Sequence, residues 1–393
     1  MNKKLNKIDE LIKELCPEGV EFKSIQKLLD EKTIATVIPP KKLTKKYYQD
    51  IGKVPIIDQG QNFIVAYTND ENVIVEKAQY VIFGDHTEAI KYVDFAFAQG
   101  ADGIKILKTN GVNTKYFYYS LKIFYKKTGK YTRHFSFLKK FKIPIPPLHI
   151  QEEIVKILDN FTELEAELET ELEARKKQYE YYREELFNIK DAKCKTLGEI
   201  GSFLRGRRFV KNDIISKGVP CVHYGEMYTY YNIWAKETKS FLDANLAKKL
   251  RVAHSGDVII VAAGETIEDL GKGVAWLGNS DVVVHDACYI FSHNLNPKYI
   301  SYFLRTKRFH SQIKRFISSG KISSINAKGL EKATIPIPPL PLQEEIVKTL
   351  DKFDTLVNDI SIGLPAELSA RRKQYEYYRE NLFNQLRIKS ITN

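Results

Sequence analysis

The sequence predicts an α+β protein with two globular domains, two long helices that pair as an antiparallel coiled coil, and an internal pseudo-two-fold repeat. The main observation is a duplicated set of motifs, IPIPPL, QEEIVK and KQYEYYRE, which begins at Ile143 and again at Ile335. This spacing is far too long for a solenoid repeat. Each copy is therefore a globular domain followed by a long helix, and the helices match much more closely than the domains do.

The motif positions divide the chain into consecutive segments. Residues 1–16 form an N-terminal helix, because apolar residues recur at intervals of three and four as far as Leu15, and Pro17 and Gly19 then end it. We expect this helix to pack near the end of the second long helix. The other segments are a first domain at 17–147, a first long helix at 148–192, a second domain at 193–339 and a second long helix at 340–393.

Short alternating segments in both domains predict strands, and one longer segment in each predicts a helix. In the first domain the strands are expected at 62–68, 79–85 and 103–108, before a helix at 115–125. In the second domain they are expected at 219–224, 257–264, 274–278 and 286–293, before a single helix at 297–316. The prolines of each IPIPPL motif stiffen an extended segment that cannot lie in a central strand.

The first long helix follows directly, with about 38 residues free of Pro and Gly, or roughly 57 Å at 1.5 Å per residue. Glutamates alternate between Glu163 and Glu173, but Glu, Leu and Ala together favour a helix over a strand. These glutamates repel one another, so Arg371, Arg372 or Lys373 is expected beside them, or else the acidic face is solvated. Apolar residues predict the seam, with one stutter, at Ile154, Leu158, Phe161, Leu164, Leu168, Leu172, Tyr179, Tyr182 and Leu186.

The second long helix contains a short insertion relative to the first, and Gly363 and Pro365 are expected to bend or interrupt it there. If the first helix carries the chain from the first domain to the second, a second helix of similar length carries it back. The two helices are then antiparallel and keep the domains at a fixed separation. The N-terminal helix would complete the repeat by packing near Leu382 and Phe383.

Composition favours a soluble protein with a polyanionic partner. The chain has 393 residues, 43% of them hydrophobic, which is enough for two ordinary cores. Its net charge of +12 suits a nucleic acid, although a chain rich in Lys, Ile, Asn and Tyr can also reflect biased codon usage. Basic residues beside aromatics and glycines at 126–134, 204–211 and 314–321 favour the nucleic acid.

Several classes of protein are disfavoured by what the sequence lacks. The four cysteines, Cys16, Cys194, Cys221 and Cys288, are scattered and indicate neither a disulfide framework nor a metal site. No apolar run is long enough to span a membrane and the N-terminus has no signal-peptide core, so we expect a cytoplasmic protein with no membrane partner.

Two dissimilar basic domains on a rigid spacer match duplex DNA, whose grooves repeat about every 34 to 36 Å. Each domain would recognise a different half of a site, with unrecognised base pairs between the halves. The chain has no methylase motif of the N-P-P-Y type, no phosphate-binding loop and no convincing cluster of nuclease carboxylates, so we expect no catalytic residue. Asp85 and His86, in FGDHT, are attributed to a hydrogen-bonded turn.

The chain resembles, over essentially its whole length, the specificity subunit of type I restriction-modification enzymes. The resemblance rests on the duplicated IPIPPL, QEEIVK and RKQYEYYR motifs, on GLPAEL from Gly363, and on IDQGQ, FGDHT, GADGIKIL and YGEMYTYY in the domains. The first copy lacks the GLP element, which leaves open whether its helix bends as its partner does.

This resemblance implies a non-catalytic subunit whose two target-recognition domains bind a bipartite, asymmetric sequence in double-stranded DNA. It also implies that the paired helices dock two methyltransferase (modification) subunits and that restriction subunits, which translocate DNA, join this core. S-adenosylmethionine and ATP with Mg²⁺ would be bound by those partners. The chain itself would bind no cofactor and no metal.

Side chains that can hydrogen-bond to base edges or phosphates are the candidates for DNA contact, and each would equally suit a solvated surface. In the two domains these are Gln59, Gln61, Thr87, Lys91, Tyr131, Arg133, His134, Arg205, Arg207, Arg208, Tyr224, Lys272 and Lys321. The tyrosines of the repeated YEYYR motif have helical spacing, which favours packing or subunit contact over base stacking. The candidates for subunit binding are Tyr181, Arg183, Tyr377 and Arg379.

Two other classes of function stay open on the sequence alone. A coiled-coil adaptor whose domains bind proteins would bind DNA weakly and without sequence preference. A nuclease would need its own acidic metal site, and Glu237-Thr238-Lys239 resembles half of such a motif without a clear acidic partner upstream.

Overall fold

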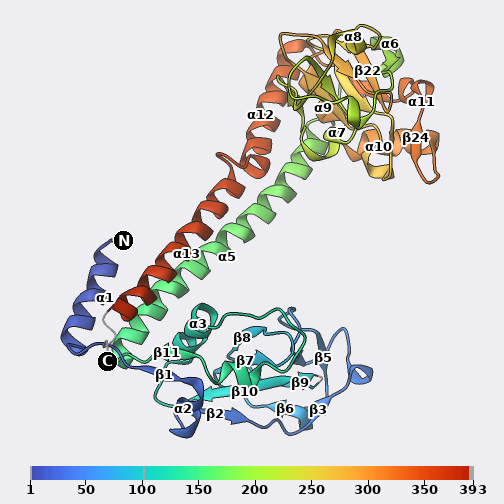
Figure 1. Ribbon diagram of the computed structural model, residues 1–393. Coiled ribbons are helices and arrows are strands. Elements are labelled where there is room, and N and C mark those ends of the chain that lie inside the picture. The colour runs from blue at the N-terminus through green and yellow to red at the C-terminus, as the bar shows by residue number, and fades with distance from the viewer. Residues whose placement is uncertain (1, 101, 389–393) are drawn as a thin grey trace. The chain divides into compact units, whose positions relative to one another are not determined.

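The computed structural model describes residues 2–100 and 102–388, whose elements divide into two compact units (Figure 1). The first unit contains the residues up to Glu167 and those from Leu368 onward, and the second contains Leu168–Glu367. Each unit combines one globular domain with parts of both long helices. The predicted α+β fold, with two domains and two long helices, is confirmed.

The core of the first domain contains two sheets and one helix. The antiparallel sheet has the order β2-β10-β7-β8, with strands Ile34–Val37, Ile104–Thr109, Tyr80–Gly84 and Ile90–Val93. The mixed sheet has the order β3-β9-β4-β5, with β6 also beside β9; its strands are Lys42–Leu43, Phe97–Gly100, Val54–Ile57, Ala66–Thr68 and Ile74–Val75. Helix α3, Thr114–Phe124, packs on the first sheet.

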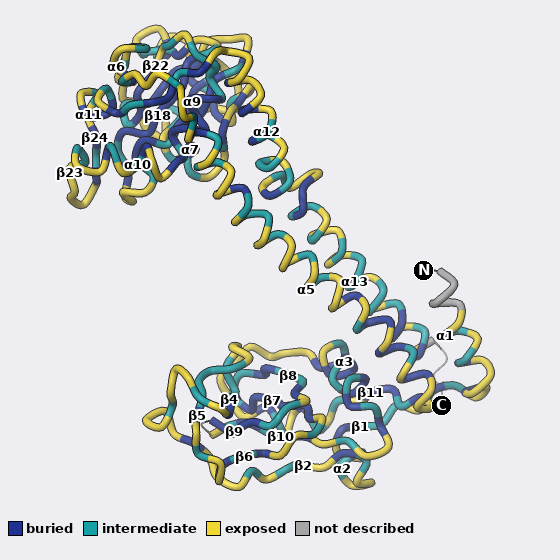
Figure 2. The backbone as a smooth tube through the Cα atoms, turned by 180° about the vertical axis from the view of Figure 1, so that it is seen from behind, coloured by how far each residue is buried: buried dark blue, intermediate teal, exposed yellow. Residues whose placement is uncertain are grey.

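Strand β7 is buried on both faces, which explains its continuous apolar sequence (Figure 2). Because successive side chains of a strand point to opposite faces, Val81 and Phe83 enter the cluster that contains α3, whereas Tyr80 and Ile82 enter the cluster on the other face. The remaining elements of the domain are α2 Ile25–Asp30, η1 Lys45–Tyr47, η2 Glu71–Val73, α4 Phe135–Leu138, and the paired strands β1 Phe22–Ser24 and β11 Lys142–Pro144.

The second domain is built on a five-stranded sheet of order β13-β22-β18-β20-β15, with strands Gly201–Arg205, Cys288–His293, Val258–Val261, Gly273–Trp276 and Trp234–Ala235. A second sheet has the order β16-β14-β21-β17, with strands Ser240–Leu242, Val219–Val222, Val282–Val284 and Val252–Ala253. A third has the order β19-β24-β23, with strands Ala263–Gly264, Ser323–Ile325 and Ile317–Ser318. Strands β12 Cys194–Thr196 and β25 Thr334–Pro336 form a separate pair.

The single helix expected at 297–316 is wrong, because the chain forms two helices there. Helix α9 covers Pro297–Phe303 and α10 covers Lys307–Ile313. The Thr306 side chain accepts a hydrogen bond from the Phe309 N–H and so caps a new helix start. The other short helices of the domain are α6 Leu197–Ile200, η3 Lys211–Asp213, α7 Glu226–Thr229, α8 Ala244–Ala247, η4 Ile267–Asp269, η5 Lys314–Phe316 and α11 Ala327–Glu331.

The internal repeat extends to individual hydrogen bonds where each domain meets its following helix. Gln151 is buried; its Nε2 donates to the Pro146 carbonyl at 2.7 Å and its Oε1 accepts from the Asn113 N–H at 2.9 Å. In the second repeat, Gln343 makes the same bonds to Pro338 and Asn296, at 2.8 and 3.0 Å. Asn113 and Asn296 cap α3 and α9, so one amide in each repeat joins a domain helix to a long helix.

Carboxylates on the long helices repeat in the same way. Asp159 receives the Lys115 Nζ at 2.6 Å and the Tyr119 hydroxyl at 2.8 Å, while Asp351 receives the Lys298 Nζ at 2.8 Å and the Tyr302 hydroxyl at 2.7 Å. These framework contacts, made by Asn, Gln, Lys, Tyr and Asp, fix both domains to their helices by the same chemistry.

The long helices lie side by side and antiparallel within each unit. Helix α5 is Leu148–Glu185, and its partners are α12, Leu340–Asn358, and α13, Leu364–Ile388. Residues that come later in α5 contact residues that come earlier in α13 and α12, which is the pattern of antiparallel helices. In the first unit Phe161 stacks on Tyr378 at 5.5 Å and Glu165 pairs with Arg372 at 2.6 Å; in the second, the Tyr179 hydroxyl donates to Asp354 at 3.2 Å and Tyr182 stacks on Phe353.

The structure shows the predicted interruption of the second long helix and the predicted basic neighbour of the acidic stretch, but it differs from the predicted seam. The interruption expected at Gly363 and Pro365 is present, because the chain leaves the helix between α12 and α13. Arg372 is the basic neighbour of the acidic stretch. Leu164 is wrongly placed in the seam, since it is 42% exposed. Tyr182 is 37% exposed, and one face of its ring packs on Phe353 of α12.

The end of each long helix reaches into the domain of the same unit. Phe383 stacks on Tyr116 at 5.6 Å and meets Phe124 at 5.8 Å, and it shares a core with Ile8 and Ile12 of α1, Asn2–Leu15. At the equivalent position of the second unit, Phe187 packs on Tyr299 at 4.9 Å and Phe303 at 5.4 Å. Leu382 also lies in the first of these cores.

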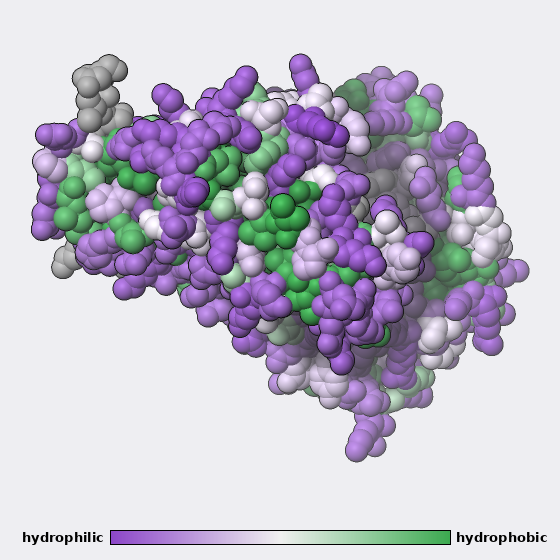
Figure 3. Space-filling model, turned by 90° about the horizontal axis from the view of Figure 1, so that it is seen from below, coloured by the Kyte–Doolittle hydropathy of each residue, from purple (hydrophilic) through white to green (hydrophobic). Residues whose placement is uncertain are grey.

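None of the four cysteines, all of which lie among the described residues, forms a disulfide, and Cys194 alone of the four is exposed. No helix among the described residues is both long enough and apolar enough to cross a membrane. In Figure 3 hydrophilic side chains cover most of the face in view, interrupted by separate hydrophobic patches.

Candidate nucleic-acid interface

Three segments of the first domain meet at one place: residues 58–63 after β4, residues 84–88 at and after the end of β7, and residues 126–135, which lead from α3 into the start of α4. The His86 N–H donates to the Gln59 Oε1 at 3.2 Å, and the Thr87 hydroxyl donates to the Gln59 carbonyl. The His86 Nδ1 lies 3.1 Å from the Thr132 carbonyl oxygen. Several candidates that are distant in sequence, Gln59, Thr87 and the 131–133 segment, are thus brought together.

Two buried carboxylates hold the basic 126–135 loop in shape. The Phe135 N–H donates to Asp85 Oδ1 at 2.7 Å. Glu88 accepts the N–H groups of Thr128 and Gly129, at 2.8 and 2.9 Å, and the Tyr125 hydroxyl at 2.6 Å. Burial acts to raise the pKa of Glu88, but these hydrogen bonds outweigh it and hold that pKa below its usual value. The acids of the FGDHTE segment therefore organise a loop.

The exposed groups of this site are aromatic and basic. Tyr131 is 86% exposed and stacks on His86, with ring centroids 5.4 Å apart. Arg133 and Gln61 are exposed, while Gln59 and Thr87 are half-buried. We call Gln59, Gln61, Thr87, Tyr131 and Arg133 the first loop surface. Cations and hydrogen-bonding groups around an aromatic ring suit contact with phosphates and bases.

Lys91 and His134 do not belong to this surface, which corrects their assignment from sequence. Lys91 is only 6% exposed, and its Nζ donates to the carbonyls of Asp58 and Asn62 at 2.9 and 2.6 Å. His134 is 2% exposed, with Nε2 at 2.6 Å from the Lys130 carbonyl oxygen. Both side chains stabilise the loops from inside the domain.

Replacing Glu88 by Gln is expected to destabilise the first unit by about 2–3 kcal/mol. The amide nitrogen of Gln cannot accept a hydrogen bond, so at least one of the buried donors that the carboxylate now satisfies would lose its acceptor. Urea unfolding measures the change, with exposed Glu71→Gln as the matched control. Since the pKa of Glu88 is lowered by folding, its contribution is complete at neutral pH and is lost only as the pH falls through that lowered value. Equal stability of the two variants would contradict this role for Glu88.

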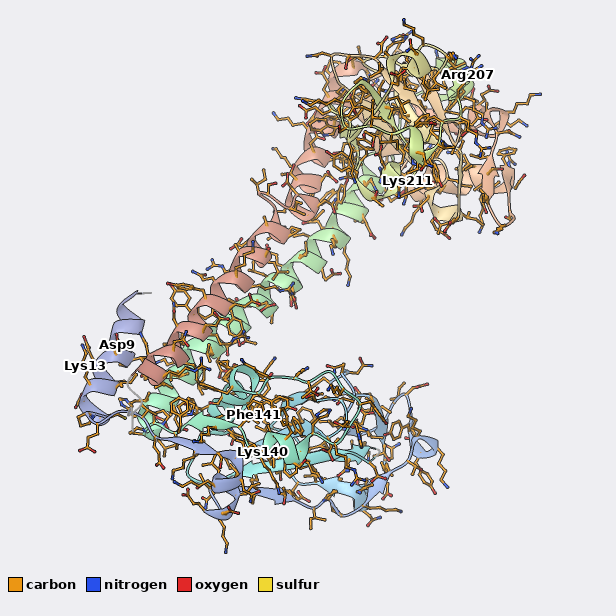
Figure 4. All side chains as sticks on the ribbon, in the orientation of Figure 1. Asp9, Lys13, Lys140, Phe141, Arg207 and Lys211 are labelled. Atoms are coloured by element: carbon orange, nitrogen blue, oxygen red, sulfur yellow. The ribbon has the colours of Figure 1, made fainter. Side chains whose placement is uncertain are left out.

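Arginines gather around a turn at Gly206 in the second domain. The Arg205 Nε donates to the Asp286 carbonyl at 2.8 Å, the Arg207 Nη1 donates to the Lys249 carbonyl at 2.8 Å, and Arg251 donates to the Arg205 carbonyl. Arg208 is exposed beside them. Each anchored guanidinium keeps further N–H groups for a ligand. Figure 4 labels Arg207, together with Lys211, in this domain.

Aromatic rings lie next to these arginines. Tyr224, 38% exposed, packs against His223 and His285, with centroids at 4.6 and 5.1 Å. Burial lowers the pKa of both imidazoles and so disfavours their protonated forms. We call Arg205, Arg207, Arg208, Tyr224 and Arg251 the second loop surface. Arg251, which lies between β16 and β17, was not among the residues predicted from the sequence, although Lys248 and Lys249 precede it in a short basic run.

Gly206 permits this arrangement by its small size. A Cβ built on Gly206 would lie 2.3 Å from the His285 carbonyl oxygen and 2.4 Å from that of Val284, and both are main-chain atoms that cannot move aside. Gly206→Ala is therefore expected to destabilise the second unit by about 2–4 kcal/mol and to displace the arginines. Calorimetry and DNA binding measure the two effects. The matched control for stability is Gly320→Ala, because Gly320 has no positive φ and only the Ile322 carbonyl oxygen, at 3.6 Å, lies near the position of the added Cβ.

The remaining DNA candidates lie apart from the second loop surface. Lys321 is exposed in the hairpin between β23 and β24, next to Ile322, which is 64% exposed. Lys272 is half-buried and paired with Asp269, and it lines a pocket with Tyr179, Arg183 and Arg305. Since this pocket lies between the domain and the helices of the same unit, Lys272 is not grouped with the arginines at Gly206.

The four candidates for subunit binding form two equivalent pairs. Tyr181 and Tyr377 are 60% and 63% exposed. Arg183 lies over the Tyr179 ring at 5.3 Å and Arg379 over the Tyr375 ring at 5.4 Å, both half-buried. The tyrosines are thus free to contact a partner, whereas the arginines mainly pack on their own helices. Among the described residues, no group of three or more His, Cys, Asp or Glu side chains is placed to hold a metal ion.

Comparison with known proteins decides the family. The model of the type I restriction modification DNA specificity domain matches residues 19–175 and 189–370. The chain belongs to this family. Members are the non-catalytic, DNA-recognising subunits of type I restriction-modification systems, and the repeated match agrees with the two domains of the fold.

Relatives support the assignment over most of the chain. The chain is 35% identical to the specificity subunit of EcoR124I/EcoR124II from Escherichia coli, covering 90% of this chain and 93% of the relative. It is 34% identical to the putative specificity subunit S.HindORF215P from Haemophilus influenzae, over 63% of this chain and 64% of that one.

Solved structures share the fold at low sequence identity. The S subunit of a type I system from M. genitalium has a TM-score of 0.53 at 16% identity, covering 93% of this chain and 96% of its own. A chain solved in work on the assembly and conformational transition of the type I system has a TM-score of 0.58 at 14% identity, covering 93% and 97%. The likeness therefore concerns the fold.

Proposed function

We propose that the chain recognises a bipartite, asymmetric DNA sequence, of which each domain binds one half. The observation that carries this proposal is that one repeated framework presents two different loop surfaces. The framework contacts of Gln151 and Asp159 recur at Gln343 and Asp351, whereas the first loop surface is mixed and the second is rich in arginine. Domains that carry different donors, each fixed to its long helix by the same framework contacts, suit different base sequences.

The long helices, in this proposal, act as the spacer between the half-sites and dock two methyltransferase subunits. Tyr181 and Tyr377 occupy equivalent positions of the repeated motif and are similarly exposed. One kind of subunit could therefore bind once to each repeat through the same aromatic side chain. Double replacement by alanine should weaken this docking more than either single replacement.

Restriction subunits that translocate DNA would join this core in the cytoplasm. S-adenosylmethionine would be bound by the methyltransferase subunits and ATP with Mg²⁺ by the translocating subunits. This chain would supply neither site and would act only by choosing the DNA sequence.

The central test is co-expression of the chain with an adenine methyltransferase subunit, followed by mapping of N6-methyladenine in the host DNA. The expected result is one motif made of two short, different sequences separated by a constant number of unspecified base pairs. Methylation at a single continuous sequence would overturn the bipartite proposal. Binding of the purified complex to that motif should remain selective as the salt concentration rises.

The same preparation separates the rival functions. A protein-binding adaptor would bind all duplexes alike and release them as salt rises. A nuclease would cut DNA when the isolated chain is incubated with Mg²⁺. Cleavage by the chain alone would defeat the proposal.

A further inference from the structure

One loop recurs in both domains, and the proposed function does not explain its recurrence. In the first domain it contains Thr128-Gly129-Lys130-Tyr131-Thr132, and in the second Ser319-Gly320-Lys321-Ile322-Ser323. Each loop leads into a short helix, α4 or α11, whose N-cap is His134 or Asn326 and whose Leu138 or Leu330 is completely buried. The two loops are therefore equivalent positions of the repeat.

Each loop exposes one large apolar side chain after its Gly-Lys pair. Tyr131 is 86% exposed and Ile322 is 64% exposed. Burying an isoleucine or aromatic side chain stabilises a protein by about 1.5–3 kcal/mol. Neither Tyr131 nor Ile322 provides this stabilisation, although they occupy equivalent positions of the repeat. A single exposed apolar residue is ordinary, but its recurrence in two otherwise dissimilar domains indicates a common ligand.

Charge identifies the class of ligand. Lys126, Lys127, Lys130 and Arg133 surround Tyr131 and are exposed, and no acidic residue occurs from 126 to 137. Lys314, Arg315, Lys321 and Lys328 flank Ile322 in the sequence and are exposed. Residues 314–330 contain no acidic residue, and these cations outnumber exposed Glu265, which follows the strand partner of Ser323. An apolar tip between cations complements the stacked bases and flanking phosphates of a nucleic acid better than it complements a protein surface.

Both tips are held by a rigid base. The Tyr131 ring is stacked on His86, and the preceding main chain is bound by buried Glu88. On the second loop, Ser323 and Ser324 belong to β24, which pairs with both β19 and β23. A preorganised side chain loses little conformational entropy on binding, so more of its contact energy is available for the ligand.

We propose that Tyr131 and Ile322 are wedges that insert between adjacent base pairs of the duplex, one in each half of the recognised site. This inference rests on the proposed function. Apolar side chains that enter a base step unstack it locally and kink the duplex. Such kinking would favour the extrusion of a base that a methyltransferase must perform.

The test uses the complex of the chain with its methyltransferase subunits and duplexes carrying the mapped motif. 2-Aminopurine, whose fluorescence rises when it is unstacked, is placed at successive positions that leave binding intact. With the target adenine itself left unsubstituted, so that its extrusion gives no signal, we expect one bright step in each half. Tyr131→Ala should abolish the bright step of the first half alone and Ile322→Ala that of the second alone, each weakening binding about tenfold.

Matched variants separate insertion from charge and from folding. Tyr131→Phe should retain the bright step, because the ring remains. Lys130→Ala should weaken binding but leave the bright step in place, and Ile38→Ala, at another exposed apolar residue of the first domain, should change neither. If Tyr131→Ala and Ile322→Ala keep both the affinity and the fluorescence pattern, the wedges are excluded while the bipartite motif stands. If no bipartite motif is found, the proposed function itself fails.

Discussion

Phe383→Ala is expected to destabilise the first unit by about 3–5 kcal/mol, the range found when a buried phenylalanine is truncated. Phe383 is 1% exposed and joins three parts of the chain that are distant in sequence. Its ring contacts Tyr116 and Phe124 of α3, and it shares a core with Ile8 and Ile12 of α1. The cavity would therefore loosen α1, α3 and the end of α13 together.

Hydrogen exchange measured by mass spectrometry is the suitable assay, since it assigns the loss of protection to each unit separately. Phe383→Ala should increase exchange in the first unit, and Phe187→Ala, the equivalent change, should do so in the second. Tyr377→Ala is the control on the same helix, because its side chain is mostly exposed. Equal exchange in Phe383→Ala and Tyr377→Ala would show that the helix end does not stabilise the domain.

The long helices could be predicted from sequence because their signals are local. Helix propensity outweighed the alternating glutamates between Glu163 and Glu173, and Gly363 with Pro365 marked the interruption between α12 and α13. The error at Leu164 has a tertiary cause. Glu165, the residue after Leu164, forms an ion pair with Arg372 of the partner helix. The apolar contacts in this part of the helix pair are made by Phe161 with Tyr375 and Tyr378, and not by Leu164.

The candidate DNA contacts were harder to predict because exposure depends on the whole fold. Lys91 occupies an inward position of β8, on the same face as buried Val93, and two carbonyls from another loop solvate its ammonium. The period of two in that strand could have indicated this burial. His134 gave no comparable signal, because its partners come from the fold of its own loop and from Glu88.

Replacing the first domain by a copy of the second is expected to convert the recognised asymmetric motif into a symmetric one. Residues 193–339 would take the place of residues 21–147. These limits are equivalent, since the Glu21 carbonyl accepts from the Ile145 N–H and the Lys193 carbonyl accepts from the Ile337 N–H, each at 2.9 Å. The graft keeps the framework contacts intact. Asn296 replaces Asn113 as the partner of Gln151. Lys298 and Tyr302 replace Lys115 and Tyr119 as the partners of Asp159.

Mapping of N6-methyladenine with the chimera should give the former second half twice, as an inverted repeat, and no methylation at the original motif. We expect the inversion because the internal repeat of the sequence predicts two repeats related by an approximate two-fold axis. The reciprocal graft, with residues 21–147 in place of 193–339, should give an inverted repeat of the first half and serves as the matched control for folding of the chimera. Retention of the asymmetric motif would place sequence recognition outside the domains, and a direct repeat would show that the framework lacks two-fold symmetry on DNA.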